Sequence, residues 1–197
     1  MQKTCVHKND GFHFLAVIES LQIVSERQTS GMKNELEMLQ RLRHPNIIQL
    51  IGVYDETFFV LELMEGGSLE EAIHSEAISS EWNHFVKCVS VDILRALVFL
   101  HNLKIPVAHL DLKSGNVLLN QSRDSAKLCD FGFAQALEQG DIYLEGVRGT
   151  PAWISPEVLA KQKVGVKTDI YGFGLIVWEM MERKRPYEGL NVDQVRV

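Results

Sequence analysis

The amino-acid sequence predicts an α+β protein in two lobes, with a small β-rich N-terminal lobe that carries one helix and a larger helical C-terminal lobe. β-Branched and aromatic residues dominate the early part of the 197-residue chain, as they do in strands. After residue 80, apolar residues recur at helical spacing instead. Strands grouped before helices indicate an α+β arrangement. The segment EGGS at residues 65–68 breaks both patterns, so we expect lobes of residues 1–64 and 65–197.

The first lobe contains three segments with the composition of strands. Residues 12–24 read FHFLAVIESLQIV and predict one strand or two. Residues 47–54 and 57–64 predict two further strands, which the polar pair Asp55-Glu56 joins. These segments supply the sheet of the N-terminal lobe.

The one helix of this lobe is predicted at residues 32–44. Its apolar side chains recur three and four residues apart, and Glu37 precedes Arg41 at the i,i+4 spacing of a favourable ion pair. Pro45 stops it, because proline cannot continue a helix. The polar segment before it, residues 25–31, predicts a loop.

The second lobe is predicted to be mainly helical. A helix begins near Ser80, a plausible N-cap, and carries apolar residues at helical spacing: Phe85, Val89, Ile93, Leu97 and Leu100. Residues 127–132 predict a short strand and turn, and residues 133–150 a long polar connection of the kind that often serves function. Residues 168–181 are apolar nearly all round, which is typical of a helix buried in a core.

Charge and cysteine content narrow the classes of partner and the location. The formal net charge is −6 and no basic run appears, so we expect neither a nucleic-acid partner nor a membrane partner. Cys5, Cys88 and Cys129 lack paired spacing, which is typical of reduced thiols in the cytoplasm. The sequence also shows no signal peptide and no apolar stretch of membrane-spanning length.

The segment VAHLDLKSGNVLLN, residues 107–120, places Asp111, Lys113 and Asn116 between apolar runs. Charged and amide side chains in such a setting are costly unless they meet each other, a metal or a ligand. We therefore expect a binding or catalytic site here.

Four motifs in order carry a resemblance to a known family. Residues 109–116, HLDLKSGN, resemble the catalytic loop H-R-D-L-x-x-x-N of eukaryotic protein kinases. Residues 130–132, DFG, resemble the metal-binding motif of that family, and 149–157, GTPAWISPE, its activation-loop end. Residues 169–174, DIYGFG, resemble the start of its central helix. The resemblance covers most of the chain and implies a two-lobed protein kinase-like fold that uses ATP and Mg²⁺.

The resemblance assigns a role to each polar residue of the loop. Asp111 is implied to accept or orient the proton of the attacking hydroxyl, and Lys113 to offset charge on the transferring phosphate. Asn116 and Asp130 are implied to hold two Mg²⁺ ions, hard cations that prefer oxygen ligands. A salt-bridged loop with no ligand remains the plain alternative.

The ATP contacts are carried over in the same way. Leu61 is implied to be the gatekeeper, and residues 62–64 the hinge that meets adenine through backbone groups. Glu35 matches the helix glutamate of the family, although an ordinary solvated helix residue remains open. The implied cofactor contacts are Ala16, Glu35, Leu61, Glu62, Met64 and Leu118, with Ala16 and Leu118 on either side of the adenine ring.

The loop and the SPE segment resemble most closely the tyrosine-kinase-like group, whose members are mainly specific for serine and threonine. The strand entry NDGFHFLAV is also similar to MAP-kinase-kinase-kinase relatives, and the sequence does not separate the two. The resemblance implies a protein substrate together with ATP.

The family pattern breaks in several places. Ile18 stands where the phosphate-binding lysine belongs, and no glycine-rich loop precedes it. Lys3, from the neighbouring strand, is an alternative source of that cation. Leu110 replaces the arginine that pairs with a phosphorylated loop, so we expect no control by phosphorylation at Tyr143. Glu157 lacks a visible arginine partner, and we expect a domain truncated at both ends.

Three functions stay under consideration. The first is a protein kinase that transfers the γ-phosphate of ATP to serine or threonine. The second is a pseudokinase that serves as a scaffold or binding module, which Ile18 and Leu110 favour. The third is a small-molecule phosphotransferase of the aminoglycoside kind, which shares an H-x-D…N…D arrangement but lacks the SPE segment and the helix of Asp169.

Overall fold

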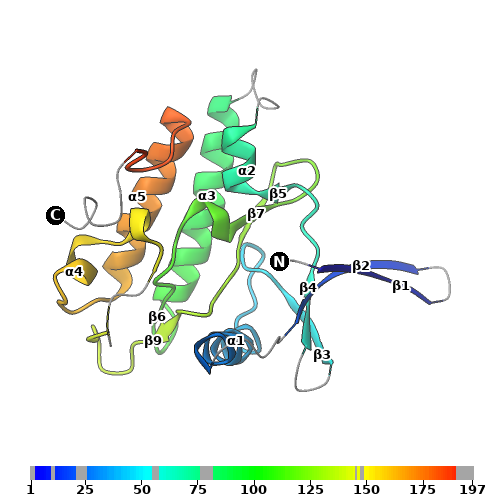
Figure 1. The fold of residues 1–197 in the computed structure, drawn as a ribbon, viewed down its shortest axis with the longest axis horizontal. Coiled ribbons are helices and arrows are strands. Elements are labelled where there is room, and N and C mark those ends of the chain that lie inside the picture. Colours follow the sequence, from blue (N-terminus) through cyan, green and yellow to red (C-terminus); the bar gives the residue numbers. More distant parts are fainter. Residues whose placement is uncertain are drawn as a thin grey trace.

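The computed structural model of the chain describes residues 3–9, 12–20, 26–54, 58–75, 82–144, 146 and 149–189. Figure 1 shows a small lobe of strands with one helix beside a larger lobe of helices, as the sequence predicts. None of the helices in the described part of the chain is long and apolar enough to cross a lipid bilayer.

The small lobe is built on an antiparallel four-stranded sheet. Its strands are β1 (Lys3–Asn9), β2 (Phe12–Ser20), β3 (Leu50–Tyr54) and β4 (Phe58–Glu62), in the order β1-β2-β4-β3. β2 fulfils the prediction of a strand from residue 12, and residues 21–24 lie outside the described part. β1 is the neighbouring strand on which Lys3 was expected, although its bounds were not predicted. The hairpin of β3 and β4 is confirmed, with both strands shorter than expected.

The predicted strand at 47–54 is wrong at its start. Ile47 and Ile48 leave the sheet and contact the larger lobe, where Ile47 forms a bridge with Leu128 and the Ile48 N–H donates to the Leu128 carbonyl at 2.8 Å. Both isoleucines are 1% exposed. Their apolar, β-branched character reflects burial between the lobes, which composition cannot distinguish from strand pairing.

Helix α1 spans Glu26–Leu39, so the predicted loop at 25–31 and the predicted helix end at 44 are both wrong. Residues 26–31 lack apolar periodicity, and although their first three residues are good helix formers, Thr29, Ser30 and Gly31 are weak ones, so neither pattern nor propensity predicted this extension. At the other end, the Arg41 N–H bonds the Met38 carbonyl three residues back at 3.0 Å. This tighter turn ends the helix before Pro45.

The larger lobe begins with β5 (Gly67–Ser68) and the short helix α2 (Leu69–His74), which was not predicted. A reciprocal capping box starts α2. The Ser68 hydroxyl accepts from the Glu71 N–H at 3.2 Å, and the Glu71 carboxylate accepts from the Ser68 N–H at 2.9 Å.

Helix α3 (Trp82–His101) confirms the predicted helix, and all five apolar residues that predicted it are buried. The expected cap at Ser80 lies outside the described residues. The remaining elements are η1 (Ser114–Asn116), η2 (Pro151–Trp153), α4 (Pro156–Leu159), α5 (Val166–Glu182) and the short strands β6 (Val107–Ala108), β7 (Val117–Leu119), β8 (Ala126–Leu128) and β9 (Gln135–Ala136). β8 and the turn after it confirm the prediction for 127–132, and the connection 133–150 contains a two-residue strand.

Helix α5 is not buried on every side. Asp169, Ile176 and Met180 are at most 1% exposed, whereas Trp178 and Met181 are 43% and 59% exposed. In the described part of the chain α5 packs against α3, β6 and η2, while Trp178 and Met181 stay exposed. The apolar sequence all round the helix predicted more burial than these neighbours provide.

Asp169, on the buried face of α5, fixes the loop that precedes Asp111. Its carboxylate accepts the backbone N–H groups of His109 and Leu110, both at 2.9 Å, and contacts His101 Nε2 at 2.8 Å. Leu110 has a φ of 63°, a left-handed conformation that costs a branched side chain about 1–2 kcal/mol. The two hydrogen bonds to Asp169 therefore hold a strained turn in place.

Glu179 joins α5 to α2. Its side chain is fully buried, and Oε1 contacts His74 Nε2 at 3.2 Å. Oε2 has no hydrogen-bond partner among the residues that the structure describes. Burial raises the pKa of the Glu179 carboxyl, the neighbouring Ser114 hydroxyl and His74 oppose the rise, and nearby Glu70 adds to it.

We predict that Asp169→Asn lowers the free energy of unfolding by about 2–4 kcal/mol. The asparagine side chain has only one acceptor oxygen, and its NH₂ group would face at least one of the three donors, which are His101 and the N–H groups of His109 and Leu110. Urea denaturation of the purified chain measures this. Glu182→Gln, an exposed change on the same helix, is the control and should leave stability within about 0.5 kcal/mol. Equal stability of the two variants would contradict the role of Asp169 in holding the turn at Leu110.

We also predict that Glu179→Gln flattens the dependence of stability on pH. Because the folded pKa lies above the unfolded one, the native state holds a proton that the unfolded chain has lost. The contribution of Glu179 to stability is therefore fully present below the pKa of the unfolded chain. It is lost as the pH rises through the pKa of the folded state. Unfolding curves from pH 4 to 7 should show the difference, in a His74→Asn background that removes imidazole titration. If the change of unfolding free energy with pH were the same with and without Glu179→Gln, the prediction would be contradicted.

Candidate active site

The loop from Leu110 to Asn116 gathers the polar residues that the sequence singled out. β6 leads into it, and η1 followed by β7 leads out, so buried apolar strands flank it on both sides. Asp111 is 5% exposed and Asn116 is 6% exposed. Their burial means that each polar atom needs a partner.

Asp111 lies at the centre of a hydrogen-bond network. Its Oδ1 accepts from both the backbone N–H and the hydroxyl of Thr150, each at 2.9 Å. Asn116 Nδ2 donates to the Asp111 backbone carbonyl at 2.9 Å and to Oδ2 at 3.1 Å. The carboxylate is therefore held in one orientation by groups from both ends of the site.

Lys113 closes the network on its other side. Its Nζ lies 3.3 Å from Asp111 Oδ2 and donates to the Thr150 hydroxyl at 2.7 Å. Thr150 therefore contacts both the carboxylate and the ammonium of this loop. Carboxylate, ammonium and amide thus satisfy one another while the ammonium stays partly exposed, so the loop combines a fixed carboxylate with an accessible cation.

A cavity of about 370 Å³ opens next to this network, between the two lobes. Pockets of this size suit a small-molecule ligand. Its lining includes seven of the predicted site residues: Glu35, Leu61, Glu62, Met64, Asn116, Leu118 and Asp130. Asp111 and Lys113 are not in the lining, and Asn116 connects them to it through its bonds to Asp111.

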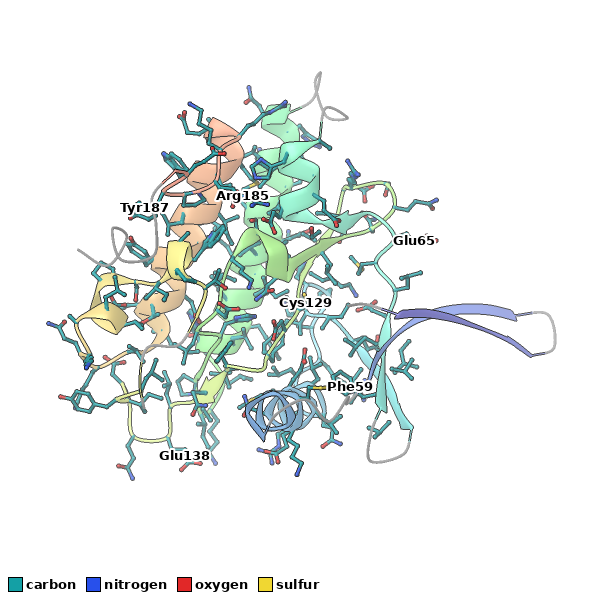
Figure 2. All side chains as sticks on the ribbon, in the orientation of Figure 1. Phe59, Glu65, Cys129, Glu138, Arg185 and Tyr187 are labelled. Atoms are coloured by element: carbon teal, nitrogen blue, oxygen red, sulfur yellow. The ribbon has the colours of Figure 1, made fainter. Side chains whose placement is uncertain are left out.

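Asp130 reaches the cavity through a strained turn. Its φ is 60°, and the Gly132 N–H donates to its Oδ1 at 3.3 Å. The next residue, Phe131, is fully buried, and its ring lies 4.9 Å from that of His109. With Phe131 in the core, the backbone turns the Asp130 side chain toward the cavity. Figure 2 shows Cys129, the residue before it, at the junction of the two lobes.

Glu35 is 5% exposed and lines the cavity. The alternative reading of this residue as an ordinary solvated helix glutamate is therefore wrong. Helix α1 carries it to the site from the small lobe, while Asn116 and Asp130 come from the larger lobe. The cavity thus collects acidic and amide groups from both lobes.

The sequence did not predict the partners of Glu62. Its Oε1 accepts from the Gln49 N–H at 2.7 Å and lies 2.5 Å from Lys127 Nζ. Lys127 sits in β8, between the buried residues Ala126 and Leu128. The alternating pattern of β8 was the available signal, since it puts Lys127 on the face opposite its neighbours. The ion pair ties the connection between the lobes to the strand that leads to Asp130.

Ala16 and Ile18 lie in β2, where the structure describes the backbone. Ala16 pairs with Glu62 in the register of β2 and β4, which places it beside the predicted hinge. Ile18 pairs with Val60 on one side and with Lys3 of β1 on the other. The predicted adenine contact of Ala16 stays a prediction.

The donor atoms suit a hard divalent cation. Asn116 Nδ2 is engaged by Asp111, which leaves its amide oxygen to face a ligand, and Asp130 offers a carboxylate in the same lining. Across the described ranges no three His, Cys, Asp or Glu side chains lie close enough to hold a metal by themselves. Mg²⁺ typically takes one or two protein oxygens and completes its shell with water and phosphate oxygens.

Comparisons with known proteins agree with this geometry. The model of the family described as "Protein kinase domain" matches residues 3–196. The chain is 34% identical over 175 residues to the probable serine/threonine-protein kinase drkA of Dictyostelium discoideum. The matched region covers 87% of this chain and 27% of that protein. It is 35% identical over 175 residues to the probable serine/threonine-protein kinase drkB of the same organism, covering 87% and 25%.

A plant protein gives a similar result. The serine/threonine-protein kinase CTR1 of Arabidopsis thaliana is 32% identical over 165 residues, covering 82% of this chain and 20% of that protein. The chain therefore spans about a quarter of the length of the curated relatives it matches. Because the family model covers nearly the whole chain and these relatives are serine/threonine-protein kinases, the chain belongs to the protein kinase domain family.

Proposed function

We propose that this chain is a serine/threonine protein kinase domain of the tyrosine-kinase-like type, which transfers the γ-phosphate of ATP to a hydroxyl of a protein substrate in the presence of Mg²⁺. The family and the names of the relatives support the reaction class. The finer group rests on the D-L-K sequence of residues 111–113 and on the segment GTPAWISPE.

One observation carries the proposal: Asp111 is held by Thr150, Asn116 and Lys113 at the edge of a cavity that Asp130 lines. Phosphoryl transfer depends mostly on positioning and on neutralising charge. The fixed Asp111 carboxylate lies beside a partly exposed ammonium and is hydrogen-bonded to Asn116, which lines the cavity, so the arrangement provides both. A purely structural ion pair would not need the neighbouring cavity or the oxygens of Asn116 and Asp130.

Each residue then has a task within this geometry. Asp111 Oδ2 orients the hydroxyl of the substrate and accepts its proton, while the Thr150 bonds keep Oδ1 fixed. Lys113 Nζ provides positive charge beside that oxygen. Asn116 and Asp130 would hold Mg²⁺ through their side-chain oxygens. Bound Mg²⁺ would supply neutralisation of phosphate charge.

The same cavity accommodates the adenosine part of ATP. Leu61 and Leu118 contribute apolar surface from the two lobes, and residues 62–64 contribute backbone groups at the connection between them. The bond of Glu62 to Lys127 fixes this connection. An apolar slot with a few convergent polar groups is the usual form of such a site.

A second candidate, a pseudokinase that binds partners without transferring phosphate, is favoured by Ile18 at the lysine position. The register of β1 and β2 places Lys3 directly across from Ile18. Residues opposite one another in an antiparallel pair share a face of the sheet. Lys3 is therefore the candidate to replace the missing cation, and its substitution separates the two functions.

Three cysteines without paired spacing support a reducing, cytoplasmic location, which we propose for the chain. Of these, Cys88 and Cys129 form no disulfide in the described part of the structure. Imaging of a tagged chain in cells tests this, and recovery in a membrane or secreted fraction would contradict it. The net charge of −6 supports a protein substrate over a nucleic acid.

We predict that Asp111→Asn lowers phosphate transfer to a generic protein substrate by about 10²–10⁴-fold, because the amide cannot accept the proton. Radiolabelled ATP and Mg²⁺ with the purified chain measure this. Asp141→Asn, an exposed change in the long connection, is the matched control and should leave the rate unchanged. Equal transfer by the chain and by Asp111→Asn would show that the activity comes from a contaminant.

We predict that Ile18→Lys raises the transfer rate by about 10²–10³-fold, since one charge-assisted phosphate contact contributes roughly 3–4 kcal/mol to the transition state. Glu19→Lys places a lysine on the other face of the strand, with a charge change of +2 instead of +1, and should not raise the rate. Lys3→Ala should abolish the residual rate of the original chain but not that of Ile18→Lys. Absence of transfer in every variant would favour the pseudokinase.

A further inference from the structure

We propose that Asn34 is a positioning residue that clamps helix α1 to the turn following Asp130, and so sets the orientation of the Asp130 carboxylate. This inference rests on the proposed function for its consequence and on the structure for its geometry. Sequence reasoning did not single out Asn34, which lies directly before Glu35 in α1.

The clamp consists of one side chain and three backbone carbonyls. Asn34 Nδ2 lies 3.0 Å from the carbonyl oxygen of Phe131, 3.1 Å from that of Gly132 and 2.9 Å from that of Ala134. These contacts join residues about a hundred positions apart in the chain, from the two lobes. An NH₂ group has two hydrogens, so the three acceptors share them.

A second observation shows how closely the helix and the turn approach. A Cβ added to Gly132 would lie 3.5 Å from the carbonyl oxygen of Gly31, one turn before Asn34 on α1. The helix and the turn are therefore separated by about the width of one methyl group, which a Cβ at Gly132 would fill in ordinary van der Waals contact. Such close packing transmits a shift of α1 directly to the turn.

The clamped turn controls Asp130 because it follows it immediately. Asp130 has a left-handed φ of 60°, and Phe131 is fully buried against His109. Any rearrangement that withdraws Asp130 from the cavity moves the carbonyls of Phe131 and Gly132 and breaks their bonds to Asn34. The clamp thus favours the orientation in which Glu35, from α1, and Asp130 line the same cavity.

Asn34→Asp tests the clamp by isosteric substitution, because it replaces the donating NH₂ with an oxygen that repels the three carbonyls. Asn34→Ala removes the donor without repulsion. Lys33→Ala, at the exposed neighbouring position of α1, is the matched control. Hydrogen–deuterium exchange of residues 131–134 should accelerate on the order of tenfold in Asn34→Asp, less in Asn34→Ala, and not at all in Lys33→Ala.

A binding measurement separates positioning of Asp130 from general damage to the fold. By calorimetry, Asn34→Asp should weaken Mg·ATP binding on the order of tenfold, because the competent orientation of Asp130 is populated less. Adenosine, which needs neither metal nor Asp130, should bind all variants within about twofold. Weakening of both ligands by the same factor would overturn the positioning role.

The outcomes distinguish this inference from the proposed function. If the original chain bound no Mg·ATP but exchange at 131–134 still accelerated in Asn34→Asp, the proposed function would fail while the clamp stood. If Mg·ATP bound and the exchange of Asn34→Asp matched that of Lys33→Ala, the clamp would be overturned while the proposed function stood. Thermal unfolding of each variant confirms that the compared chains are folded.

Discussion

The carboxylate of Asp169 is the interaction on which the rest of the larger lobe depends. It is almost completely buried on α5 and accepts the backbone N–H groups of two successive residues, His109 and Leu110. The residue that follows them is Asp111, so a central helix sets the position of the carboxylate that we propose to be catalytic by way of the main chain. A buried charge of this kind is tolerated because hydrogen bonds from the loop and from His101 surround it.

From this anchor the site extends in two directions. Through Asn116 it reaches the cavity between the lobes, and through Thr150 it reaches the far end of the long connection. The small lobe joins at the turn after Asp130, where Asn34 donates to the Phe131 carbonyl while the Phe131 ring packs against His109. Catalytic geometry here is a property of contacts between distant segments, and no single segment holds it.

The sequence predicts a feature when the residues that form it are neighbours in the chain, and it misses features formed by residues that are remote in sequence. The spacing of Phe85, Val89 and Ile93 gave α3, and the polar residues inside the segment 107–120 gave the site, since both patterns lie within one stretch of chain. Helix α1 was misplaced because its first residues are polar, and Ile47 was assigned to a strand because burial between lobes looks the same in composition. Asn34 and Lys127 were missed because their partners are remote in sequence.

Leu110 occupies the place of an arginine, and its surroundings show what that exchange does. It is 7% exposed and belongs to a buried apolar cluster with Leu137 of the long connection and with Ile154, Val158 and Val164, which follow it in the chain. Where an ion pair would hold such a segment, exclusion of water holds it here. Added salt screens an ion pair but has little effect on apolar contacts, whereas cooling weakens apolar contacts. The order of this segment therefore follows temperature more than ionic strength, and limited proteolysis across both conditions would reveal it.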